Sequence, residues 1–263
     1  MRIFYKHIIL KTINSTPMKR VKYTLTLFVA LTFLFLTNAL GQSTYSEESS
    51  LVNQQIWIDL YPHYYRTKKM EYYGDTGYRT ILNEKTWSRV YVRPSLRYHF
   101  NKNWELQGGI GFFYIFNADN VDQFEVRPWQ GIQLNGPRFR RFKFKNSLKL
   151  EERWSYLTDN WDANFEFRLR YKISGSVVLN DKWGVPFYGE AFLPLSGKVE
   201  ELYQNQGRAG VGLSYKATKD WKLAFVMNWQ RSKAGQDAEV GISDYAYQLK
   251  IIKKWKRLVK LKH

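Results

Sequence analysis

The stretch TWSRVYVRPSLRYHF, residues Thr86–Phe100, alternates between two kinds of side chain. Every second residue from Ser88 to Phe100 is mostly apolar, whereas the residues between them include three arginines. Because side chains alternate across a β-strand, the stretch predicts one apolar face and one arginine-bearing face. A soluble sandwich would bury the apolar face. The arginines, an aromatic content of 17% and an upstream secretion signal instead favour a membrane barrel, with apolar side chains toward lipid and arginines toward the lumen.

The N-terminal prefix has the layout of a secretory signal peptide. Basic residues at Met18–Arg20 precede an apolar core at Leu25–Leu36, and small residues follow at Asn38–Gly41. We therefore expect cleavage before Gln42. The apolar core is shorter than the roughly 20 residues that a membrane-spanning helix needs, so a retained anchor is disfavoured.

Composition excludes several classes of protein. The chain has no cysteine, which rules out disulfides, thiolate metal sites, cysteine nucleophiles and a lipoprotein anchor. Few histidines occur and they are scattered, so we expect no metal site and no cofactor. The formal net charge is +18. An exported chain seldom meets nucleic acid, so we expect outer-membrane lipids and lipopolysaccharide as its partners.

The alternation recurs along the chain and predicts an all-β fold. We expect a transmembrane, antiparallel, up-and-down β-barrel of about ten strands, or twelve if Arg66–Lys85 adds a hairpin. Proline is awkward inside a strand, and we expect a kink or bulge at the central Pro94. The expected strands are Gln55–Tyr65, Thr86–Phe100, Trp104–Phe116, Gln123–Leu134, Phe139–Trp154, Ala163–Leu179, Val185–Leu195, Arg208–Lys216, Trp221–Gln230 and Asp244–Trp255.

The connections are expected to differ at the two ends of the barrel. Tight turns such as Asn101–Asn103 follow alternate strands, and longer loops, notably Arg66–Lys85, Ser196–Gly207 and Arg231–Ser243, follow the others. Outer-membrane barrels have short periplasmic turns and longer outer loops. Three tight turns lead into a tryptophan, and we expect these three, Trp104, Trp183 and Trp221, at the periplasmic membrane rim.

Two segments resemble a known family when taken together. These are Glu125–Gly131, with the sequence EVRPWQG, and Leu148–Trp154, with the sequence LKLEERW. With Gln54–Trp57 and Asn205–Arg208, they resemble the exported Gram-negative proteins catalogued as domain of unknown function 2490. The resemblance covers about residues 50–255 and implies an outer-membrane β-barrel to which no activity is assigned.

The polar faces of the expected strands carry opposite charges. Glu-x-Arg recurs three times and puts both members on one face of a strand. In a narrow barrel these charges must pair, because an unpartnered buried ion costs several kcal/mol. We expect a lumen charge network of Asp59, Arg89, Arg93, Arg97, Glu125, Arg127, Glu151, Arg153, Glu166, Arg168, Arg170 and Glu190.

The sequence leaves three hypotheses for the molecular function. The leading one is a monomeric structural or small-anion-binding barrel with an ion-paired lumen. The alternatives are a narrow anion-preferring channel and a lipid-modifying enzyme. For the enzyme, His63 near the outer end of the first strand is the only candidate base, and no nucleophile motif accompanies it. We divide the chain into a signal peptide at 1–41 (with 1–17 a spurious extension if translation starts at Met18), a linker at 42–54, a bacterial outer-membrane barrel at 55–255 and a basic tail at 256–263.

Overall fold

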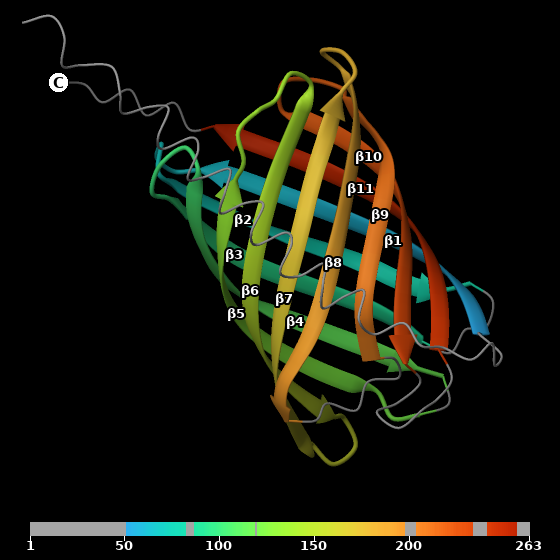
Figure 1. Cartoon of the computed structure of the whole chain (residues 1–263). Helices are drawn as coiled ribbons and strands as arrows, with labels where there is room; N and C mark the ends of the chain where they lie inside the picture. Colours follow the sequence, from blue (N-terminus) through green and yellow to red (C-terminus); the bar gives the residue numbers. More distant parts are fainter. Residues whose placement is uncertain (1–50, 83–86, 119, 198–203, 234–240, 257–263) are drawn as a thin grey trace, which may run out of the picture. The chain divides into compact units, whose positions relative to one another are not determined.

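Eleven strands close into one β-barrel in the computed structural model (Figure 1). The described residues are 51–82, 87–118, 120–197, 204–233 and 241–256, all within the compact unit Thr44–His263. The expected signal peptide, the cleavage before Gln42 and most of the basic tail lie outside them. No helix long and apolar enough to cross a membrane occurs in the described segments. The strands are β1 (Leu51–Tyr65), β2 (Met70–Ile81), β3 (Trp87–His99), β4 (Trp104–Asn117), β5 (Gln123–Asn135), β6 (Phe142–Leu157), β7 (Ala163–Val178), β8 (Trp183–Gly197), β9 (Gln204–Lys216), β10 (Trp221–Lys233) and β11 (Gly241–Lys256).

The barrel closes between its first and last strands. Every strand pairs antiparallel with the next along the chain, and β1 pairs parallel with β11 from Leu51↔Ile242 to Tyr65↔Lys256. In Figure 1 the blue β1 and the red β11 lie side by side and point the same way. Strand direction alternates in an up-and-down barrel, so an odd number of strands requires one parallel pair. The expected strand count of ten or twelve was therefore wrong.

The additional strand is β2, which lies inside the expected loop Arg66–Lys85. Its inward face includes the buried carboxylates of Glu71 and Asp75. Its outward face has Tyr72, Gly74, Thr76 and Tyr78 where other strands have aliphatic residues. Because glycine and threonine stand at two outward positions, apolar and polar residues do not alternate clearly, and the pattern did not reveal this strand.

The connections are short at both ends. The turn end holds residues 66–69, 100–103, 136–141, 179–182 and 217–220, and the described connecting residues at the loop end are 82, 118, 120–122 and 158–162. The expected long loops are shortened by strand at both ends, because β8 runs to Gly197, β9 begins at Gln204, β10 runs to Lys233 and β11 begins at Gly241. Paired strands satisfy each other's backbone groups, which favours extending the ladder over leaving a polar loop.

Pro94 disturbs the sheet less than expected. The pairing register runs without a shift across it, from Val92↔Phe112 to Ser95↔Gly109. A glycine faces this region on each neighbouring strand: a Cβ on Gly109 would lie 2.5 Å from the Pro94 carbonyl oxygen, and a Cβ on Gly74 would lie 2.5 Å from that of Arg93. The two glycines let the strands approach closely. One register shift lies instead opposite Pro194, between Phe167 and Arg168.

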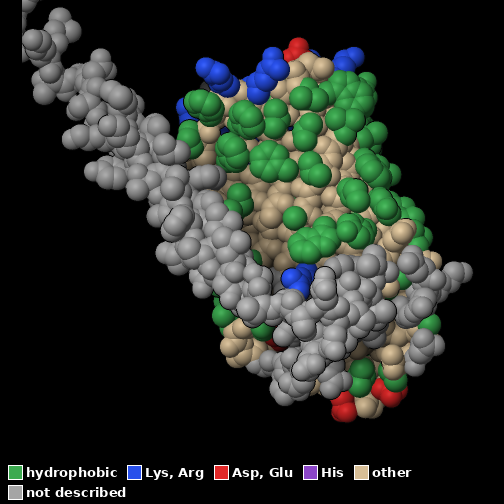
Figure 2. Space-filling view, turned by 45° about the vertical axis from the view of Figure 1, so that its right-hand side comes forward, with side chains coloured by type: hydrophobic (Ala, Val, Ile, Leu, Met, Phe, Trp, Pro, Cys, Tyr) green, Lys and Arg blue, Asp and Glu red, His purple; other side chains and the backbone are tan. Residues whose placement is uncertain are grey.

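The barrel wall has opposite surfaces outside and inside. Figure 2 shows hydrophobic side chains spread over the visible wall, with Lys and Arg, together with an acidic group, along the top edge and Asp and Glu at the bottom edge. Val92 is 50% exposed and Leu96 47%, whereas Glu151 is fully buried and Arg153 is 1% exposed. The apolar outward face expected for Thr86–Phe100 is observed. Most buried side chains in the described barrel are polar, the reverse of an ordinary soluble domain.

Candidate functional site

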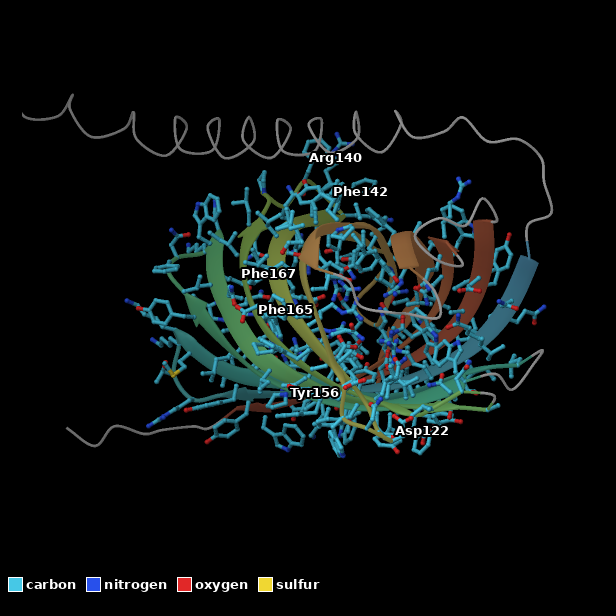
Figure 3. All side chains as sticks on the ribbon, turned by 90° about the horizontal axis from the view of Figure 1, so that it is seen from below. Asp122, Arg140, Phe142, Tyr156, Phe165 and Phe167 are labelled. Atoms are coloured by element: carbon cyan, nitrogen blue, oxygen red, sulfur yellow. The ribbon has the colours of Figure 1, made fainter. Side chains whose placement is uncertain are left out.

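The lumen is filled by charged side chains from neighbouring strands. Figure 3 shows nitrogen and oxygen atoms crowded inside the ring of strands. Every member of the expected charge network is oriented inward, on β1, β3 or β5 to β8. The structure divides the network into a tightly paired group in the middle and a second cluster nearer the turn end.

The middle group centres on two buried glutamates. Glu125 accepts hydrogen bonds from Arg127 Nη2 at 2.7 Å and Arg153 Nε at 2.7 Å. Arg153 also reaches Glu166 at 3.3 Å. Glu151 accepts from Arg168 at 2.8 Å and from Arg170. Arg170 bridges onward to Glu190 on β8. These pairs link the neighbouring strands β5 to β8 along the inner wall, with both members of most pairs desolvated.

Asp75 was missing from the expected network although it is central to it. Arg93 binds it with two parallel hydrogen bonds, Nε to Oδ1 at 2.8 Å and Nη2 to Oδ2 at 2.7 Å. Such a forked pair is the strongest arrangement of these groups. Asp75 lies on β2, so the same weak alternation that hid the strand hid this residue. Glu71 and Arg79, also on β2, were missed for the same reason.

The second cluster lies at the turn end and contains two histidines. His63 Nδ1 lies 2.5 Å from Glu71 Oε1, and Arg97 donates to Glu71 Oε2 at 2.8 Å. His99 lies 3.4 Å from both Glu71 and Glu105. His63 was expected at the end with long outer loops. It lies at the turn end instead, because β2 follows β1 after only residues 66–69.

A cavity of about 100 Å³ lies within the middle of the lumen. Nine cationic side chains and two carboxylates line it among the described residues. Aromatic rings separate the cations: Arg79 and Arg208 lie over the Trp57 ring at 4.2 and 4.7 Å. Arg89 contacts Trp87 and Phe113. The lining is Trp57, Tyr61, Asp75, Arg79, Arg89, Tyr91, Arg93, Phe113, Arg127, Arg168, Arg170, Lys172, Tyr188, Glu190, Phe192, Arg208, Gln248 and Lys250.

The cavity lining suits anions rather than metal ions. Guanidinium and ammonium groups only donate hydrogen bonds, so they match oxyanions. In the residues that the structure describes, no group of three or more His, Asp or Glu side chains is arranged to hold a metal ion. Three of these cations, Arg208, Lys172 and Lys250, occupy inward-facing positions of strands that the sequence predicted. Alternation could have identified them, and only their convergence on one cavity required the structure.

The three tryptophans expected at the membrane rim follow turns of the same geometry at the turn end. Asn101 Oδ1 accepts hydrogen bonds from the backbone of Asn103 and Trp104. Asn180 makes the same two contacts before Trp183, and Thr218 before Trp221. A side-chain oxygen that satisfies two backbone donors fixes a tight turn without a long loop. Trp183 and Trp221 are about 40% exposed on the outer wall.

The family model described as protein of unknown function (DUF2490) matches residues 54–240. The chain belongs to this family. The DUF2490 match runs from β1 to the connection before β11, so it covers most of the barrel. Its description assigns no activity. The two segments that carried the resemblance, on β5 and β6, contain Glu125, Arg127, Glu151 and Arg153 of the ion-paired lumen. No curated protein matches the chain.

Proposed function

We propose that this DUF2490 protein is a monomeric bacterial outer-membrane β-barrel whose ion-paired lumen is sealed and holds a small anionic ligand. The observation that carries the proposal is the sidedness of the wall. Ile58, Val92 and Phe225 are about half exposed outside, while Glu125, Glu151 and Arg153 are buried inside. Water disfavours so continuous an apolar exterior, whereas lipid favours it.

The outward row of β10 supports a membrane setting. It contains Leu223, Phe225 and Met227 between Trp221 and Trp229, all about 40 to 53% exposed. At roughly 3.4 Å per residue, the two tryptophans lie about 27 Å apart along the strand. The apolar band of an outer-membrane barrel is about 25 Å tall and has aromatic girdles at both edges. At the tilt of roughly 35–45° usual for such strands, the height across the membrane is about 19–22 Å, somewhat less than that band.

The two ends carry charges of opposite sign. The turn end is basic: residues 66–69 include Arg66, Lys68 and Lys69 and residues 136–141 include three arginines, against Asp181 and Asp220 in the other turns. The described loop-end residues 82, 118, 120–122 and 158–162 include Asp122, Asp159 and Asp162 and no Lys or Arg. A basic rim suits anionic headgroups, such as those of phospholipids or lipopolysaccharide.

The paired charges in the lumen favour a sealed barrel over the anion-preferring channel. Arg93, Arg153 and Arg170 each bind a carboxylate on the neighbouring strand at hydrogen-bond distance, and these buried pairs occupy the middle of the lumen. His63 is held by Glu71 and stacks on Tyr73. These contacts explain His63 as a member of the lumen network. We therefore do not propose that the protein is a lipid-modifying enzyme.

Insertion and conductance together test the proposal. The purified barrel, refolded in detergent, is mixed with phospholipid vesicles and then incorporated into planar bilayers. We expect it to float with the vesicles and to show no steady current. Protein that stays folded in buffer without detergent would contradict the membrane setting. Steady anion-selective current steps would contradict the sealed lumen and support the channel.

A further inference from the structure

Eight of the nine cationic side chains around the cavity fall on two unlike sides. On the first side, Arg93, Arg127, Arg168 and Arg170 each lie within 2.8 Å of a carboxylate oxygen. Arg93 on β3 binds Asp75 on β2, whereas the other three, on β5 and β7, bind the glutamates of β5 and β6. Their charges are neutralised by direct hydrogen-bonded pairs. No additional anion is needed to balance the positive charge of these four arginines.

The second side is formed by four loosely paired cations from four strands. Arg79 Nη2 lies 3.5 Å from Asp59, and Lys172 Nζ lies 3.5 Å from Glu190. Arg208 Nη1 lies 3.9 Å from the same glutamate, whose other oxygen is already bound by Arg170. Among the described residues, no salt bridge joins Lys250 to a carboxylate, and Asp59, its register partner on β1, already accepts hydrogen bonds from Tyr91 and Gln248. Positive charge is therefore in excess here.

Aromatic rings hold these cations without neutralising them. Trp57 lies between Arg79 and Arg208, and the Tyr188 ring lies 3.8 Å from Lys172 Nζ and 5.4 Å from Lys250 Nζ. A ring attracts a cation through its quadrupole but supplies no net negative charge. Four cations inside a barrel would repel one another strongly unless an anion lies between them.

We propose that the cavity beside Arg79, Lys172, Arg208 and Lys250 binds a doubly charged oxyanion of the phosphate or sulfate kind. Its volume of about 100 Å³ suits a small tetrahedral anion or the phosphate of a small monoester. Guanidinium and ammonium groups make charge-assisted hydrogen bonds to such oxygens. A dianion balances more of the local charge than chloride does. The inference deepens the proposed anion-binding function by naming the ligand class and the residues.

Titration calorimetry of the folded barrel in non-ionic detergent tests this inference. Sodium phosphate, sodium sulfate and glycerol 3-phosphate are titrated at constant ionic strength, with sodium chloride as the reference. We expect phosphate and sulfate to bind and chloride to give no saturable heat. If glycerol 3-phosphate binds and inorganic phosphate does not, the natural ligand is a phosphate monoester.

Two variants and a matched control locate the site. Lys250→Gln and Arg79→Gln should each weaken phosphate binding about tenfold or more, the loss of one charge-assisted contact. Lys254→Gln is the control, since Lys254 follows Lys250 on the same strand and face but does not line the cavity. It should bind phosphate as the wild type does.

Folding can be separated from binding in these variants. Lys250→Gln removes a buried charge that forms no salt bridge among the described residues, so its thermal midpoint without phosphate should equal or exceed that of the wild type. A folded wild type that binds neither phosphate, sulfate nor glycerol 3-phosphate would overturn the inference, as would unchanged binding by Lys250→Gln. An inserted, non-conducting barrel with that result would keep the sealed membrane barrel and lose only this ligand class. A conducting barrel that binds phosphate would keep this ligand class and contradict the sealed lumen.

Discussion

At the scale of single residues, the lumen depends on where each buried charge finds its partner. Glu125 binds Arg127 within one strand, as the Glu-x-Arg spacing suggests. Glu151 instead binds Arg168 and Arg170 on β7. The spacing in sequence predicts which face a charge occupies. The partner depends on the neighbouring strand, because directly opposite side chains are as close as residues two apart.

Arg93→Gln tests whether the ion pairs stabilise the barrel. The substitution leaves Asp75 buried without its forked partner, and we expect a loss of about 3 kcal/mol or more in the free energy of unfolding. Urea unfolding followed by tryptophan fluorescence measures the change. Arg138→Gln, at an exposed position in the 136–141 turn, is the control and should change stability by less than about 0.5 kcal/mol. Equal stability of Arg93→Gln and wild type would contradict a structural role for the pair.

At the scale of strands, close backbone approach decides which positions accept a side chain. Pro94 offers β4 no backbone donor, and the strands on both sides approach it at glycines. The register stays continuous because Gly74 and Gly109 leave room beside the carbonyl oxygens of Arg93 and Pro94. A proline inside a strand therefore need not produce a bulge when the adjacent strands supply glycine.

Gly109→Ala tests this packing between strands. The new methyl group would lie 2.5 Å from the Pro94 carbonyl oxygen and 2.6 Å from Ser95 Oγ. We expect a destabilisation of about 1–3 kcal/mol, the usual cost of overpacking. Gly189→Ala on β8 is the matched control, since nothing lies within 4 Å of its Cβ position. Thermal unfolding of both variants gives the comparison, and an equal effect at both positions would argue against close approach at Pro94.

At the scale of the whole molecule, the odd number of strands places the start of β1 and the end of β11 at opposite ends of the barrel. β1 begins at the loop end and β11 finishes at the turn end, because the two strands run parallel. An even-stranded barrel would return the chain to the end where it began. The closure also brings Lys250 of β11 beside Asp59 of β1, and so completes the wall of the cavity.

A cysteine pair tests the parallel closure. The chain has no cysteine, so Ile58→Cys with Leu249→Cys introduces two isolated thiols at paired positions on the outer wall. We expect oxidation to join them, since neighbouring strands bring paired residues within disulfide range. Ile58→Cys with Phe225→Cys, one strand further away, should stay reduced. Gel mobility after mild oxidation and limited proteolysis distinguishes the two, and a cross-link in the control alone would refute the closure.

The sequence by itself determined the β-class, the inward arginines and the apolar exterior. These follow from a period of two, which is a local property that any one strand displays, as Trp221 to Trp229 does. Only the tertiary structure decided that β2 is a strand, that Asp75 pairs with Arg93, and that Arg79, Lys172, Arg208 and Lys250 converge on one cavity. Convergence depends on the register of every strand pair and on closure between β1 and β11. Those relations link residues far apart in the chain, and no local pattern encodes them.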